Sequence, residues 1–200
     1  MSGANAQALE AKIVELIGTG DAAAASDSGV PGHMDLNGFL LKNGMECLNE
    51  SDDHTLKDAL SPGHGAYLES DCDEQLIISM EFSQNVKLHS LRLDGPAGQG
   101  PKTIKIFVNQ PQTLDFDKAD SMEAVQILQL SEKDLTSKEP IPLRYVKFQN
   151  VSNLQMFVKD NQKGTETTVI HYLGFIGSPV STTNMSDFKR ISGKKGESHS

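Results

Sequence analysis

The sequence lacks tryptophan, has aromatic side chains at only 6% of its 200 positions, and contains two cysteines. The scarcity of aromatic rings leaves few platforms on which sugar rings could stack, which weighs against a lectin-like site. Cys47 and Cys72 lie far apart and form no Cys-x-x-Cys motif, so the chain has no dithiol redox centre of its own. Because no secretory signal is recognisable, we expect two free thiols; a regulatory redox pair is the alternative.

Long apolar runs and an excess of positive charge are missing as well. No apolar run approaches the ~20 residues of a membrane span. The net charge is −9 and the pI about 5.1, and an acidic chain repels phosphate backbones. We therefore expect no membrane and no nucleic-acid partner. A hydrophobic content of 37% over this length predicts one monomeric domain with a lean core and tails.

No recognisable catalytic or cofactor motif is present. The glycines of GPAGQGP (95–101) are in the wrong order for a phosphate-binding loop and no helix follows them, so they predict a turn. The Gly-x-Ser-x-Gly elbow of hydrolases is absent. One loop-rich region gathers possible metal ligands at spacings that match no known pattern: His54, His64, Asp71, Cys72, Asp73 and Glu74. We interpret that region as a solvated acidic loop, and expect no enzyme, no resident metal and no cofactor.

Alternating apolar side chains predict a series of strands rather than helices. The pattern recurs in segments 74–82, 86–93, 103–109, 125–130, 143–150, 154–160 and 168–176. A change of phase at His89-Ser90 suggests a bulge. Residues 44–73 and 110–124 have the composition of long loops, and Ser131–Asp134 that of a capped turn of helix. Strands joined without helices predict an all-β antiparallel sandwich or jelly roll with few short helices and flexible termini.

The segment LRYVKFQNVSNLQMFV (143–158) carries the clearest of these patterns. It predicts two half-buried strands around a polar break, with Val146, Phe148, Leu154, Met156 and Val158 facing the core. The opposite face would expose the side chains of Tyr145, Lys147, Gln149, Gln155, Phe157 and Lys159. Aromatic and cationic side chains are typical of protein contacts, so we select Tyr145, Lys147, Phe157 and Lys159 as candidate partner-binding residues.

Composition also sets the domain boundaries. Residues 1–32 combine a short amphipathic helix near 5–17 with a Gly/Ala/Ser/Asp-rich linker. The β-sandwich domain is expected at 33–180, followed by a largely mobile extension at 181–200. Lys194, Lys195 and His199 lie in that extension, which could enter a partner's cleft. There His199 could ligate a metal held by the partner.

Several motifs, in this order, together resemble the PITH domain, the proteasome-interacting thioredoxin domain. They are MDL (34–36), ECLNESDDH (46–54), ESDCDEQL (69–76), FSQNVKLHSL (82–91), GPKTIKIF (100–107), PLRYVKFQNVSNLQMFV (142–158) and TNMSDFKR (183–190), and they span roughly 31–190. The resemblance implies a jelly-roll sandwich similar to galactose-binding-like domains. It also implies a non-catalytic, cytosolic and nuclear domain that docks a thioredoxin-like protein onto the proteasome regulatory particle. Thiol–disulfide activity would then belong to a thioredoxin domain that this chain does not contain.

A jelly roll leaves one further function open. Sandwiches of this type often bind carbohydrates or small molecules at their loop ends. The loops around 61–73 and 95–101 would be the walls of such a site.

Overall fold

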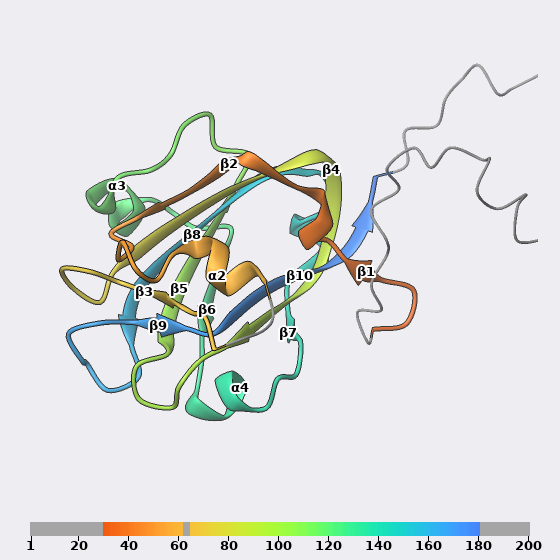
Figure 1. Cartoon of the computed structure of the whole chain (residues 1–200). Coiled ribbons are helices and arrows are strands. Elements are labelled where there is room, and N and C mark those ends of the chain that lie inside the picture. The colour runs from red at the N-terminus through yellow and green to blue at the C-terminus, as the bar shows by residue number, and fades with distance from the viewer. Residues whose placement is uncertain (1–29, 62–64, 181–200) are drawn as a thin grey trace, which may run out of the picture.

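The computed structural model describes residues 30–61 and 65–180, which form a strand-rich sandwich (Figure 1). The helix predicted near residues 5–17 and the mobile extension predicted at 181–200 lie outside the described residues. Inside the described part, antiparallel strands dominate and the helices are short. The predicted fold class is therefore confirmed.

Two sheets account for the described strands. Their bounds are β1 (Met34–Asp35), β2 (Leu40–Leu48), β3 (Leu68–Glu69), β4 (Leu76–Asp94), β5 (Pro101–Val108), β6 (Gln126–Gln129), β7 (Ile141–Pro142), β8 (Val151–Asn161), β9 (Val169–Ile170) and β10 (Tyr172–Pro179). The large sheet runs in the order β1-β10-β4-β8-β5-β6, with β2 and β7 also paired to β4, and β3 pairs with β9 separately. All of these pairings are antiparallel.

The 19-residue strand β4 joins the two halves of the large sheet. Its first half pairs with β2 and β8, and its second half with β10. Ser90 faces Ile176 whereas Leu88 faces Gly177, so His89 has no partner on β10. One extra residue on a strand is a bulge, and it shifts the side-chain alternation by one position. The phase change predicted at His89-Ser90 is confirmed.

Five short helices connect or cap the strands. They are η1 (Asn37–Phe39), α2 (Leu56–Leu60), α3 (Phe116–Ser121), α4 (Glu132–Thr136) and η2 (Tyr145–Lys147) in the described residues. The turn predicted at Ser131–Asp134 is the start of α4, where Ser131 and Asp134 form a capping box. A second capping box, between Thr55 and Asp58, begins α2.

Two regions predicted as long loops contain strands and helices, so the prediction was wrong there. Residues 44–73 contain most of β2, all of α2 and β3, and residues 110–124 contain α3. The pairing of β2 with β4 is irregular between Leu40 and Met45, which removes the two-residue period that marks a strand. In α3, Asp115 caps the helix by accepting a hydrogen bond from the Lys118 amide at 2.7 Å, a signal that the sequence carries.

Two apolar clusters fill the sandwich. The main core includes the inward face predicted for β4 at Leu76, Ile78, Met80 and Phe82. The second cluster packs α3 and the loop before it onto the opposite face of the sheet, and consists of Ile77, Phe107, Leu114, Ala119 and Phe157. Both faces of the sheet are therefore covered at this point.

The second cluster overturns two predictions for β8. Phe157, predicted to lie on the solvent face, is 1% exposed and meets Phe116 edge-on at a ring distance of 6.2 Å. Gln155 is also buried, and its side chain accepts from the Leu114 amide and donates to the Gln112 carbonyl, both at 2.9 Å. Alternation alone cannot distinguish an exposed face from one covered by a loop.

The strand predicted over 143–150 was also wrong. The Leu143 amide donates to the His89 carbonyl at 3.0 Å, and the Phe148 carbonyl accepts from the Leu88 amide at 2.9 Å. Both ends are thus tied to β4, while the residues between them form the outward turn η2. Phe148 is buried as predicted, but Val146 is 87% exposed.

The burial of Phe157 yields a stability prediction. Replacing a buried phenylalanine by alanine removes apolar contacts and leaves a cavity, so Phe157→Ala should lower the free energy of unfolding by about 3–5 kcal/mol. Val146→Ala, at a side chain that is 87% exposed, should change it by about 0.5 kcal/mol or less. Urea titration followed by circular dichroism measures both values; equal effects would contradict the assignment of the two faces.

Candidate functional site

The turn η2 displays an exposed set of apolar, aromatic and cationic side chains. We call Tyr145, Val146 and Lys147, together with the neighbouring rings of His33 and His89, the η2 surface. The His33 and His89 ring centroids are 4.3 Å apart, and Tyr145 lies 6.4 and 6.1 Å from them. This surface thus combines residues before β1, at the β4 bulge and in η2.

Hydrogen bonds hold η2 in one conformation. The Arg144 amide donates to Oε1 of the buried Gln126 at 2.8 Å. Gln149 Nε2 donates to the Tyr145 carbonyl at 2.6 Å, and Lys147 Nζ to the Val125 carbonyl at 3.4 Å. A surface that is already ordered loses less conformational entropy when it binds a partner.

The four contact residues predicted from the sequence do not form one surface. Tyr145 and Lys147 belong to η2, whereas Phe157 lies inside the second apolar cluster. Lys159 Nζ lies 2.5 Å from Asp120 Oδ1 on α3. The hydrogen bond from Lys159 lowers the pKa of the Asp120 carboxyl, and this pair fastens the end of α3 to the sheet. Lys194, Lys195 and His199 lie outside the described residues.

Val146 and the two histidines were missed as surface residues. The alternation of segment 143–150 assigned Val146 to the core. Pro140 and Pro142 precede the turn, and prolines interrupt the ladder of a regular strand, so they are the signal that could have found it. The meeting of His33 with His89 depends on tertiary pairing and has no local signal.

Both cysteines are free thiols. Cys47 is half-buried on β2, and burial, with Glu50 and Glu46 nearby, raises the pKa of its thiol. Cys72 is exposed and donates from Sγ to Asp71 Oδ2 at 3.3 Å. This hydrogen bond and the Asp71 charge raise the pKa of the Cys72 thiol. Reactive cysteines need the opposite shift.

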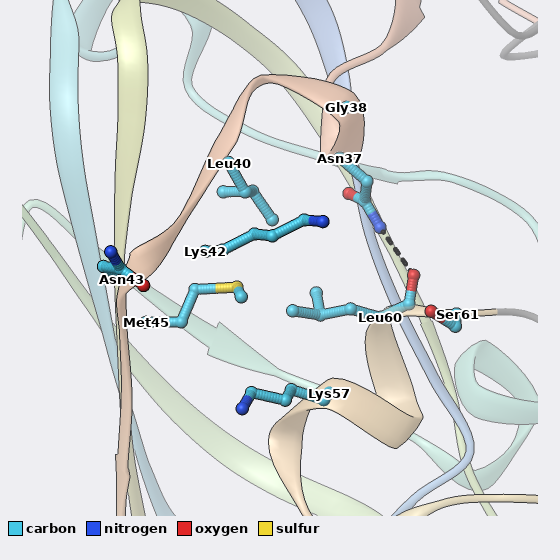
Figure 2. Close-up of a pocket in the computed structure, with 9 residues that line it drawn as sticks. All are labelled: Asn37, Gly38, Leu40, Lys42, Asn43, Met45, Lys57, Leu60 and Ser61. Carbon is cyan, nitrogen blue, oxygen red and sulfur yellow. Dashed lines mark hydrogen bonds between the residues drawn. The ribbon is translucent and has the colours of Figure 1, made fainter.

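A cavity of about 510 Å³ lies between β2 and α2, and part of its lining falls in the region 44–73 that was predicted as a loop. Its lining is Asn37, Gly38, Leu40, Lys42, Asn43, Met45, Lys57, Leu60 and Ser61. Figure 2 shows the Lys42 side chain crossing the middle of the group, with Leu40 above it, Met45 and Leu60 below it, and Lys57 at the lower edge. No motif in the sequence indicated this pocket, because its residues come from η1, β2 and α2 and meet only in the folded domain.

The described residues offer no group of three or more His, Cys, Asp or Glu side chains that could hold a metal ion. His64 is outside them. None of the described helices is long and apolar enough to cross a bilayer.

Comparisons with solved structures identify the fold. The family 32 carbohydrate-binding module of Clostridium perfringens NanJ, solved in complex with galactose, superposes with a TM-score of 0.54 and 8% identity, covering 72% of this chain and 98% of that one. Another C. perfringens module of this family, in complex with GalNAc-β-1,3-galactose, gives a TM-score of 0.52 and 9% identity, covering 70% and 98%. The described domain is a galactose-binding-like jelly roll, and at this identity the likeness shows the fold alone.

Comparisons with sequences identify the family. Thioredoxin-like protein 1 of Schizosaccharomyces pombe is 38% identical over 200 residues, which cover 96% of this chain and 69% of the relative. PITH domain-containing protein 1 of Homo sapiens is 30% identical over 139 residues, covering 66% of this chain and 64% of that protein. The family model of the PITH domain matches residues 26–193. The chain therefore belongs to the PITH domain family.

Proposed function

We propose that this domain is a non-catalytic docking module that binds a protein partner through the η2 surface. The observation that carries the proposal is Val146, a β-branched apolar side chain that is 87% exposed on a turn held by hydrogen bonds. Most large apolar side chains of the described domain are buried. One that is displayed beside a tyrosine and a lysine has the composition of an interface centre.

The energetics favour binding at this turn. Removing a valine side chain from water contributes about 1.5–3 kcal/mol to an association. Tyr145 adds aromatic area, since it is 39% exposed with one edge already packed against the histidines. The fixed backbone of η2 lowers the entropic cost of ordering these groups.

The partner in this proposal is the proteasome regulatory particle. The name of the PITH family, the proteasome-interacting thioredoxin domain, supports this choice, and the family match places the chain in that family. Action as a monomer in the cytosol and nucleus, without cofactor, belongs to the same proposal. A non-catalytic role is part of the same proposal.

The docking proposal predicts the effect of a charge on η2. Val146→Asp should weaken binding to purified regulatory particle by about 2 kcal/mol, roughly 30-fold, because an apolar contact becomes a buried charge. Biolayer interferometry with immobilised domain gives the dissociation constants. The matched control is Ile127→Asp, at another exposed apolar side chain (53%) on β6, and it should bind like the wild type.

Two results would count against the proposal. Retention of the Val146→Asp variant equal to that of the wild type would exclude η2 as the contact. Failure of the wild-type domain to bind at low salt would exclude the regulatory particle as the partner.

The environments of the cysteines yield a separate prediction that bears on a regulatory redox pair. A raised pKa leaves little thiolate at neutral pH, so the reaction of Cys72 with Ellman's reagent should keep accelerating to a higher pH than that of a cysteine in an unfolded peptide. Asp71→Asn removes the negative charge and leaves only a weaker, neutral acceptor for the Cys72 thiol, so it should lower the pKa of that thiol and speed the reaction at pH 8. In a Cys72→Ser variant the remaining Cys47 should react slowly until urea unfolds the domain. Fast native labelling of Cys47, or a slower Asp71→Asn variant, would contradict these assignments.

A further inference from the structure

The cavity between β2 and α2, which we call the β2–α2 pocket, has the features of a ligand site. We propose that it binds an extended, acidic peptide segment that places one bulky apolar side chain between Lys42 and Lys57. This function is separate from docking through η2.

The floor of the pocket is apolar and continuous with the core. Leu40, Met45 and Leu60 are each half-buried and pack against the main apolar cluster. A volume of about 510 Å³ lies within the range of roughly 300–1,000 Å³ that is usual for ligand pockets. Met45 is unbranched and flexible, so it adapts its shape to different apolar side chains.

Asn37 fixes one wall of the pocket. Its Nδ2 donates to the carbonyls of Leu60 at 3.3 Å and Leu173 at 3.0 Å, and its Oδ1 accepts from the Phe175 amide at 3.0 Å. The bond to Leu60 runs along the edge of the cavity in Figure 2. One side chain thus links η1, α2 and β10, so the pocket is formed before any ligand arrives.

The charge at the pocket is opposite to that of the chain. Lys42 and Lys57 are exposed, and neither belongs to the ion pairs of the described residues, which join Lys105 and Lys159 to Asp120 and Lys163 to Glu132. The acidic side chains of α2 and its approach keep their charge but do not line the pocket: Asp58 accepts from Thr55, and Glu50 from the Leu56 amide. Two unpaired ammonium groups on a chain of net charge −9 favour an anionic ligand.

The edge position of β2 favours a peptide over a compact molecule. In the described residues β2 pairs only with β4, so its other edge leaves backbone groups unpaired. An extended segment can add to such an edge by main-chain hydrogen bonds while one side chain enters an adjacent pocket. The irregular stretch between Leu40 and Met45 bends around the cavity, as Figure 2 shows.

The test uses a fluorescein-labelled octapeptide in which glutamates flank a central leucine–phenylalanine pair. Titrated into the full chain, it should give a saturable increase in fluorescence anisotropy and shift the NMR amide signals of β2 and α2.

The double variant Lys42→Glu/Lys57→Glu should weaken binding by about tenfold or more, because two attractions become two repulsions. Lys118→Glu/Lys133→Glu, which carries the same charge change on α3 and α4, should stay within about twofold of the wild type. Ser61→Trp should obstruct the pocket without altering its charge and should also reduce affinity.

Three comparisons decide the chemistry of the ligand. A peptide with lysines in place of glutamates, or with serines in place of the apolar pair, should bind much more weakly. Equal binding of the serine peptide, or of the wild type and the pocket variants, would overturn the proposal. Saturable binding of octanoate or galactose at these residues, without the peptide, would overturn the choice of occupant. Val146→Asp should bind the octapeptide normally, so failure of docking through η2 and failure of this site are distinguishable.

Discussion

The register of β4 is the constraint on which the rest of the large sheet depends, because this one strand is hydrogen-bonded to β2, β7, β8 and β10. A slip of one residue would turn its inward side chains outward along the whole strand. Leu88 and Leu91 are three residues apart, so strict two-residue alternation would place them on opposite faces of β4. The bulge at His89 shifts the alternation by one position and allows both side chains to reach the core. The same bulge supplies the carbonyl that holds Leu143, and so it starts the excursion that forms η2.

The second apolar cluster shows how a lean sequence builds a two-sided sheet. The main core contains the edge-on pair of Phe82 and Phe175, and the second cluster has Phe157 packed in the same way on Phe116. Most of the described phenylalanines are therefore buried in one of the two clusters, so few aromatic side chains remain for the surface of a sequence that has few of them. Among the exposed large apolar side chains of the described residues, Tyr145 is the aromatic one.

Sequence patterns predicted the fold class and much of β4, β5 and β8 because those strands bury one continuous face in the main core. They failed at Phe157, where α3 and the loop before it cover the face of β8 that was expected to be exposed. They also failed at Val146, where the chain leaves the strand conformation between two ends that are bonded to β4. The β2–α2 pocket was beyond reach for a different reason. Its lining is assembled by the irregular pairing of β2 and by the side chain of Asn37, and neither has a local periodicity.

The two candidate surfaces share a scaffold at β1. His33 precedes this strand and belongs to the η2 surface, while Asn37 follows it and fixes the wall of the pocket. The pairing of Met34 with Gly177 and of Asp35 with Ile176 fixes where these two residues lie in space. A side chain at Gly177 would overlap the Lys87 carbonyl on β4, so glycine is required where β10 approaches β4. The close contact of β1, β10 and β4 at this point therefore places both surfaces, and Asn37 reinforces it through its hydrogen bonds to Leu173 and Phe175 on β10.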